Sequence, residues 1–214
     1  MSVNRIAIID YGASNLRSVV KALEKVGHSP LVVETPEQII NAKGLLLPGQ
    51  GASGPAMRAL ENRGLVTPIL DSIDRGVPYL GVCLGLQLLM DSSDESEEPC
   101  LGILRGDTVR FPADLPHTLK VPHMGWNQVR LCGDHPVLEG IPQHSNFYFV
   151  HSYIARPKDQ RVVAGISEHG VEFCSIVAQE NLVATQFHPE KSGMLGLKLY
   201  HNFVRFAFGE KVGA

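Results

Sequence analysis

The chain has 214 residues, of which 44% are hydrophobic and 19% are charged, as is typical of a globular α/β protein with a sizeable core. Nineteen basic against 22 acidic residues give a formal net charge of −3, and no cluster of Lys and Arg indicates a nucleic-acid surface. No apolar run reaches the ~18 residues of a membrane span, and the first residues lack the apolar core of a signal peptide. We therefore expect a soluble cytoplasmic protein, with one domain over residues 1–214.

The first half of the chain alternates strand-like and helix-like segments. Apolar runs typical of strands buried on both faces lie at 5–10, 29–34, 44–49 and 77–82. Helical spacing of apolar residues indicates helices at 16–26, 35–40, around 56–60 and 69–73, and at 84–90. This alternation predicts an α/β fold: an open, largely parallel twisted sheet with helices on both faces.

The character of the sequence changes after an acidic run, "DSSDESEE" at 91–98, which we interpret as a solvated loop. Short strand-like segments separated by turns then predict an antiparallel extension in the C-terminal half; they lie at 106–111, 127–131, 147–155, 162–167, 173–179 and 182–188. A closing helix is expected at about 193–208, with four apolar side chains facing inward: Leu195, Leu199, Phe203 and Phe206.

One cysteine stands between two glycines where a predicted strand meets a predicted helix. The segment "GVCLG", residues 81–85, has the spacing of the G-x-S-x-G nucleophile elbow. A strained turn of this kind needs neighbours without side chains. The start of the helix would favour the thiolate of Cys83, and the N–H of Leu84 would be free to face an oxyanion. The alternative is a buried structural cysteine, with glycines present for packing.

A cysteine nucleophile needs a base and a group that orients the base. His188 ends the apolar segment 182–187, and Glu190 follows two residues later, on the same side if the chain is extended. Active sites of open α/β sheets lie at the carboxyl ends of strands, so we expect His188 and Glu190 to meet Cys83 there. The other cysteines lack such a setting and are interpreted as inert, reduced thiols: Cys100, Cys132 and Cys174.

The segment "GQGASG", residues 49–54, matches the G-x-G-x-x-G pattern of dinucleotide sites. It follows the third predicted strand rather than the first, and Asp71 lies inside a helical pattern, so we reject that reading. The loop could instead supply a second oxyanion N–H, from Gln50 or Gly51. We expect no cofactor and no metal, since a metal site would have to assemble distant histidines: His117, His123 and His135.

Together these residues resemble the triad-type (class I) glutamine amidotransferases. The motifs "GVCLGLQLL" and "HPEKS" carry the resemblance to the superfamily, and "PHMGWN" with "FYFVHSY" carries a narrower one, to glutaminase subunits of imidazole glycerol phosphate synthase. The resemblance implies that Cys83 forms a glutamyl thioester, that His188 transfers the protons and that Glu190 holds the imidazole. It also implies an oxyanion hole formed by the N–H groups of Leu84 and residue 50.

The same resemblance implies two further groups of residues. Positions that hold the α-amino and α-carboxyl groups of glutamine are Gly51, Gln87, Glu95, Ser152 and Tyr153. Positions that face a (β/α)8-barrel cyclase partner in a heterodimer are Asn15, Trp126, Tyr148 and Lys191. Trp126, the only tryptophan, is expected in a polar loop as an interface anchor, with a core position as the alternative.

The chain departs from the family at one position, because Gln50 replaces the valine of the more common "PGVG" loop. A change of side chain preserves a backbone donor but could alter how easily that peptide turns. Two other functions remain open on the residues alone. One is the glutaminase of another pathway, such as pyridoxal phosphate synthesis, and the other is a non-catalytic α/β interaction subunit.

Overall fold

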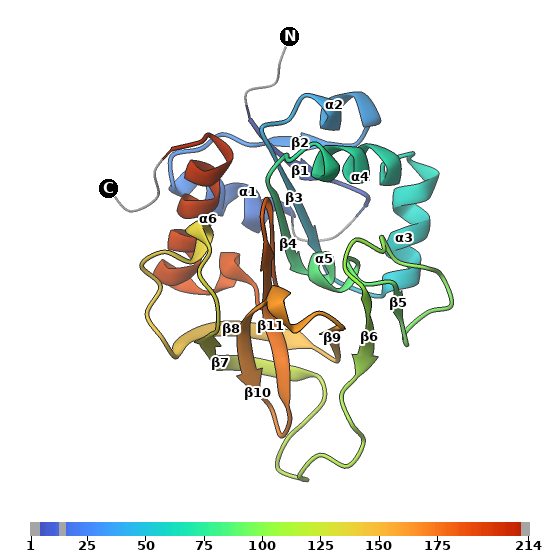
Figure 1. Ribbon diagram of the computed structural model, residues 1–214, viewed down its shortest axis with the longest axis vertical. Coiled ribbons are helices and arrows are strands. Elements are labelled where there is room, and N and C mark those ends of the chain that lie inside the picture. The colour runs from blue at the N-terminus through green and yellow to red at the C-terminus, as the bar shows by residue number, and fades with distance from the viewer. Residues whose placement is uncertain (1–4, 13–15, 211–214) are drawn as a thin grey trace.

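The described residues of the computed structural model, 5–12 and 16–210, include twelve strands in one mixed sheet (Figure 1). Five strands are parallel, in the order β2 (Leu31–Val33), β1 (Ile6–Ile9), β3 (Gly44–Gly49), β4 (Tyr79–Cys83) and β12 (Leu182–Thr185). An antiparallel part continues through β11 (Glu172–Gln179), β10 (Val163–Glu168), β7 (His123–Leu131) and β8 (Ser145–His151). Beside it, β9 (Tyr153–Pro157) joins β11 to β6 (Gly106–Arg110), which pairs with β5 (Ser92–Ser93). The predicted fold class is confirmed.

Helices cover the parallel strands on both faces, which explains why those strands are apolar throughout. One face carries α2 (Pro36–Ile40), α3 (Ser53–Asn62), α4 (Val66–Asp74) and α5 (Leu84–Gln87). The other carries α1 (Leu16–Lys25) and α6 (Gly193–Ala207); Figure 1 shows these two helices on the left of the central strands and α3 and α4 on the right. Successive residues of β1 point alternately into the core on one face and the core on the other, so every residue of the strand must be apolar.

Several features differ from the sequence-based expectations. The strand expected at 147–155 is divided at Ser152 into β8 and β9. The helix expected at 84–90 ends at Gln87, because the N–H groups of Leu89 and Met90 bond to carbonyls only three residues back, as in a tightening last turn. Strand β12, expected in the antiparallel extension, pairs in parallel with β4. The acidic run is not simply a solvated loop, since it contains β5 and the buried Ser93.

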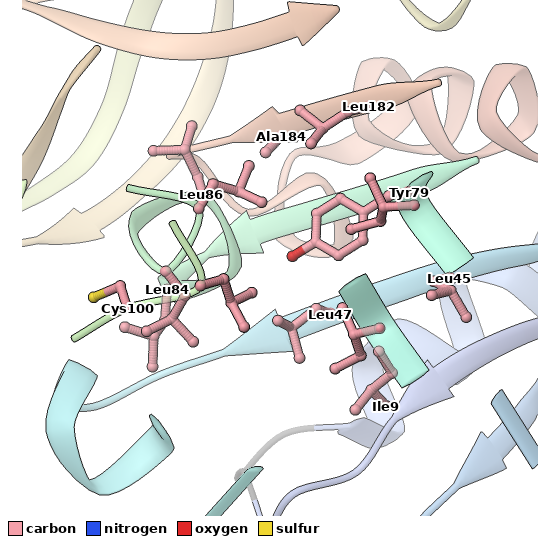
Figure 2. Packing of buried hydrophobic residues seen from close by; sticks show 14 of the residues in the cluster. Ile9, Leu45, Leu47, Tyr79, Leu84, Leu86, Cys100, Leu182 and Ala184 are labelled. Carbon is pink, nitrogen blue, oxygen red and sulfur yellow. The ribbon is translucent and has the colours of Figure 1, made fainter. Parts of the chain in front are cut away.

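The segment after β4 is anchored by the core on the α2–α5 face. Figure 2 shows Leu84 and Leu86 of α5 among the apolar side chains of the neighbouring strands, with Cys100 close to Leu84. The buried hydroxyl of Tyr79 donates to the carbonyl of Gly85, 3.0 Å away. These contacts hold the turn between β4 and α5 in place. In the described part of the chain, no helix combines the length and the hydrophobicity needed to span a membrane.

Candidate active site

Cys83 ends β4 in a backbone conformation that side chains rarely adopt, with φ 54° and ψ −100°. Its flanking glycines are explained by close backbone approaches. A Cβ at Gly81 would lie 2.5 Å from the carbonyl oxygen of Gly85, and one at Gly85 would overlap the carbonyl oxygen of Leu47 in β3. The predicted elbow is therefore present, and its glycines let α5 pack directly against two strands. Cys83 itself carries the strain.

His188 and Glu190 lie in the segment after β12, around the short helix η3 (Pro189–Lys191). Nδ1 of His188 is 2.8 Å from Oε1 of Glu190, and both side chains are 2% exposed. The hydroxyl of Tyr200 in α6 donates to Oε2 of the same carboxylate at 3.3 Å. The hydroxyl of Ser192 donates to the His188 carbonyl at 2.6 Å. The imidazole is thus fixed from the side away from the thiol.

The remaining ring nitrogen of His188 is left free to interact with Cys83. This atom, Nε2, is buried and has no hydrogen-bond partner among the described residues, while the imidazole interacts with the Cys83 sulfur. Burial alone lowers the pKa of His188, but the neighbouring Cys83 and Glu190 outweigh burial and raise the pKa to about 10. An imidazole that is readily protonated beside a thiol favours a thiolate–imidazolium pair.

The other cysteines do not share this setting. Burial raises the pKa of Cys100 to about 11 and that of Cys174 to about 12, so both remain protonated thiols at neutral pH. Cys132 is exposed and, like the other three cysteines, free. Among the four cysteines, Cys83 is therefore the one that interacts with a histidine held by a carboxylate.

Cys83 opens onto a cavity of about 370 Å³ that brings together residues from distant parts of the sequence. Seven of the residues selected from the sequence line it: Gln50, Gly51, Cys83, Gln87, Glu95, Ser152 and Tyr153. Pro122, Val150 and His151 also line the cavity and were not selected. Because five separate stretches of the sequence contribute, the cavity exists only in the folded chain.

Gln87 can offer only an acceptor to a ligand in this cavity. Its Nε2 donates to the backbone carbonyl of Tyr153 at 3.0 Å and to Oε1 of Gln186 at 3.2 Å. An amide nitrogen carries two hydrogens, so both donors are used. The oxygen of Gln87 is then the atom free to face a donor such as an ammonium group.

Glu95 is half-buried and has a defined place despite its acidic surroundings. Its Oε2 accepts from the backbone N–H of Ser53, the first residue of α3, at 2.9 Å. A carboxylate at a helix N-terminus interacts favourably with the free N–H groups there. The interpretation of the acidic run as a solvated loop is wrong for Glu95, because its carboxylate bonds to the start of α3 and lines the cavity.

The loop after β3 lies beside the nucleophile, since Gly49 and Cys83 are paired in register. Gly51 has φ +100°, a conformation that favours glycine, and no atom within 4 Å of the position a Cβ would take. The "GQGASG" pattern therefore builds a turn at the cavity mouth. Asp71, the residue that a dinucleotide site would need, lies exposed in α4.

His151 is a cavity residue that the sequence reasoning missed, although it lies in the quoted motif "FYFVHSY". Its Nδ1 contacts the carbonyl of Tyr153 at 2.9 Å and its Nε2 contacts Nδ1 of His123 at 3.0 Å. Burial, ahead of the other causes, lowers the pKa of His151 to about 3 and that of His123 to about 4. Both rings are neutral at pH 7, and they hold the Tyr153 backbone beside Gln87.

Among the histidines considered as metal ligands, His123 is occupied with His151, and Nε2 of His135 faces the carbonyl of Glu180. No group of three or more metal-ligating side chains occurs among the described residues.

Three of the four predicted interface residues can be described, and they lie next to one another. Trp126 is 58% exposed and packs edge-on against Tyr148, with ring centroids 6.1 Å apart. Nζ of Lys191 lies 5.9 Å from the centroid of the Tyr148 ring. Trp126 belongs to β7 rather than to a polar loop, and the alternative of a core position is wrong. Asn15 lies outside the described residues.

The fold and the elbow define a class of protein, and the comparison with known families names it. The model of the family described as glutamine amidotransferase class-I matches residues 7–205, so the chain belongs to this family. A crystal structure titled as a glutamine amidotransferase has a TM-score of 0.74 at 20% identity, covering 95% of this chain and 98% of that one. The structure of PurLQS from Thermotoga maritima gives 0.75 at 18% identity, with the same coverage. These two similarities concern the fold.

Within the family, the most informative relatives carry the name imidazole glycerol phosphate synthase subunit HisH. One from Dehalococcoides mccartyi is 46% identical over 207 residues, covering 96% of this chain and 99% of the relative. Another from Moorella thermoacetica is 48% identical over 199 residues, covering 92% and 93%. The chain therefore groups with the HisH subunits, and the resemblance seen in its motifs is confirmed.

Proposed function

We propose that the chain is the glutaminase subunit of an imidazole glycerol phosphate synthase, acting in histidine biosynthesis in the cytoplasm as a single domain over residues 1–214. It hydrolyses glutamine to glutamate and ammonia. The ammonia passes to a (β/α)8-barrel cyclase subunit that forms imidazole glycerol phosphate and AICAR. One observation carries the proposal: a cysteine on a strained elbow faces a buried histidine whose other nitrogen is held by a carboxylate. The cysteine of this unit lines a cavity of about 370 Å³.

Acylation begins with transfer of the Cys83 proton to Nε2 of His188. The sulfur attacks the carboxamide carbon of glutamine, and the tetrahedral intermediate collapses to a glutamyl thioester as His188 returns the proton to the leaving ammonia. In the second half of the reaction, His188 takes a proton from water as the water oxygen attacks the thioester carbonyl. The C–S bond then breaks, glutamate leaves, and His188 returns the proton to the sulfur of Cys83. Glu190 keeps Nδ1–H of the ring in place throughout, which leaves Nε2 available for each transfer.

The intermediate needs donors for its oxyanion. The N–H of Leu84 opens α5 directly behind the nucleophile, where a helix has no internal partner for it. The second donor is the N–H of Gln50, in the loop paired in register with Cys83. Each such donor contributes about 3 kcal/mol of transition-state stabilisation in hydrolases of comparable chemistry.

The cavity lining fits an α-amino acid. Glu95 and the oxygen of Gln87 are acceptors for the α-ammonium group of glutamine. Gly51, Ser152 and Tyr153 lie along the same cavity, and we assign them to the α-carboxylate through their backbone N–H groups. These contacts would place the side-chain amide at the Cys83 sulfur.

The partner is proposed to dock on the face formed by Trp126, Tyr148 and Lys191. This face is continuous with the catalytic segment, because Lys191 follows Glu190 directly. An exposed tryptophan packed against a tyrosine, with a cation above the tyrosine ring, is the type of side-chain group that dominates protein interfaces. Met124, 63% exposed and two residues before Trp126 on the same side of β7, extends it.

The test is glutamate release by the purified chain, with and without the barrel subunit and its nucleotide substrate. We expect a low basal rate that rises steeply with both additions and is absent in Cys83→Ala. A fast rate without any partner would contradict the proposed gating. Failure to copurify with a barrel of about 250 residues would contradict the assignment to this synthase. Gln50→Val tests the loop. If its basal and stimulated rates both match those of the wild type, Gln50 has no part in partner control.

A further inference from the structure

A second buried side chain contacts the nucleophile. Gln186 lies between β12 and His188 and is 0% exposed. Its Nε2 is 3.6 Å from Sγ of Cys83, within hydrogen-bond range for sulfur. Its backbone N–H donates to the carbonyl of Ser175 in β11 at 2.9 Å, which anchors the residue to the sheet. The contact therefore joins the ends of two adjacent strands at the reacting atom.

Which atom of Gln186 faces Cys83 is determined by a backbone carbonyl, which can only accept a hydrogen bond. The carbonyl of Tyr153 can only accept, so the side chain of Gln87 must present its NH2 group there. The second hydrogen of that group meets Gln186, so Gln186 must present its oxygen to Gln87. Its own NH2 group is then left to face Cys83. The sulfur accepts an N–H, and an acceptor role suits a thiolate better than a thiol.

We infer that Gln186 is a further catalytic residue of this site, which donates a hydrogen bond to Sγ of Cys83 and stabilises its thiolate. In acylation the bond increases the fraction of sulfur that is ready to attack, with the proton on His188. In deacylation it stabilises the same sulfur as the departing group when the C–S bond breaks. As a statement about glutamine chemistry, this inference rests on the proposed function; the contact with Cys83 does not.

Other groups near the sulfur could also affect the ionisation of Cys83, so the test must distinguish their effect from that of Gln186. His188 approaches from η3 with Glu190 behind it, and the Tyr11 hydroxyl lies close enough for its charge state to interact with Cys83. The carbonyl of Val150 in β8 lies 3.9 Å from Sγ. Burial, followed by Cys83 and Asp10, raises the pKa of Tyr11 far above neutral, so Tyr11 does not titrate with the thiol. The Tyr11 hydroxyl is also an uncharged donor, but Gln186 is the donor whose nitrogen lies at hydrogen-bond distance from Sγ.

The test measures how fast iodoacetamide alkylates Cys83 between pH 5 and 10, in the full chain without glutamine or partner. Mass spectrometry of the peptide containing Cys83 separates it from the exposed Cys132. Gln186→Met keeps the shape of the side chain and removes the donor. Gln186→Glu replaces the donor with an acceptor that becomes negatively charged. Ser175→Ala, on the adjacent strand, is the matched control, because it removes a buried hydroxyl and leaves the side chain of Gln186 in place.

We expect the pH midpoint of alkylation to rise by about one unit in Gln186→Met, corresponding to about tenfold less thiolate below the midpoint, and further in Gln186→Glu. Ser175→Ala should match the wild type. Thermal unfolding of each variant shows whether it is folded at the assay temperature, and a general loosening of the fold would not produce this order of midpoints. Equal midpoints in folded wild type and Gln186→Met would overturn the inference.

A second readout separates this inference from the proposed function. With the barrel subunit and its ligand present, Gln186→Met should lower kcat for glutamate release about tenfold, beyond any rise in KM caused by a displaced Gln87. A rise in KM with kcat unchanged would limit Gln186 to positioning Gln87, which also overturns the inference. If the wild type releases no glutamate but the alkylation midpoints shift as expected, the proposed function fails and the role of Gln186 stands.

Discussion

Replacing Gly81 by alanine tests whether the nucleophile turn depends on a backbone approach that admits no side chain. The added Cβ would lie 2.5 Å from the carbonyl oxygen of Gly85 and 2.9 Å from Cβ of Ala184. An ordinary contact begins near 3.4 Å, so the neighbours would have to move by several tenths of an ångström to almost 1 Å. One neighbour is the backbone of α5 and the other belongs to the core strand β12, so neither can yield as a flexible side chain would.

Overpacking of a well-packed core costs about 1–3 kcal/mol, and two rigid neighbours place Gly81→Ala at the upper end, about 3 kcal/mol. For a chain of this size that corresponds to a fall in Tm of about 6–12 °C. The glutaminase rate should also fall, because relief of the clash displaces the residues that frame Cys83.

Circular dichroism thermal unfolding measures the change in Tm, with Gly133→Ala as the matched control. A Cβ at Gly133 would meet only atoms of Ala164, at 3.7 and 3.8 Å, and its stability should stay within about 0.5 kcal/mol of the wild type. A Gly81→Ala protein as stable and active as the wild type would refute the steric argument. So would equal losses of stability in the two variants, since that would point to a general effect of the added methyl group.

Three further predictions concern the partner face, the acid side of the stability curve and the segment that carries the base. Trp126→Ala should leave Tm nearly unchanged and weaken binding to the barrel subunit at least about fivefold by titration calorimetry. Ile40, 50% exposed at the end of α2, serves as the control: Ile40→Ala should bind normally, and equal weakening would contradict the surface assignment. The folded-state pKa of His123 is about 4, below the ordinary 6.5, so protonation favours the unfolded chain and stability is lost as the pH falls below 6.5. Urea unfolding should show that His123→Gln loses about 2 kcal/mol less than the wild type between pH 7.5 and 5, and parallel losses would be the contrary result. A Cβ at Gly196 would overlap the carbonyl oxygen of Pro189, which directly follows the base His188. Gly196→Ala should therefore displace His188 and lower kcat for glutamate release about tenfold or more. A normal rate would show that α6 can shift away without disturbing the site.

The sequence determined the local structure and the identity of the reacting group. Unbroken apolar runs predicted the parallel strands because those strands are covered on both faces, and the glycines around Cys83 predicted a tight elbow that the backbone angles bear out. The two-residue spacing put Glu190 within reach of His188, but Glu190 lies in the short helix η3 rather than in an extended segment, so the turn of that helix places Oε1 of Glu190 at Nδ1 of His188. The assignment of glutamine came from motif resemblance, because no periodicity or spacing encodes a substrate.

Only the tertiary structure decided which distant groups meet. Gln186 reads as one more residue of a strand end in "LVATQFH", and it becomes a contact of the nucleophile because β12 pairs in parallel with β4, which brings both carboxyl ends to one edge of the sheet. Glu95 in an acidic run appears solvated until the start of α3 is placed against it. Trp126 could have been core or surface, since composition does not record which face of β7 the rest of the chain covers. Local sequence fixes backbone preference and chemical type, whereas partners depend on long-range packing that no single segment contains.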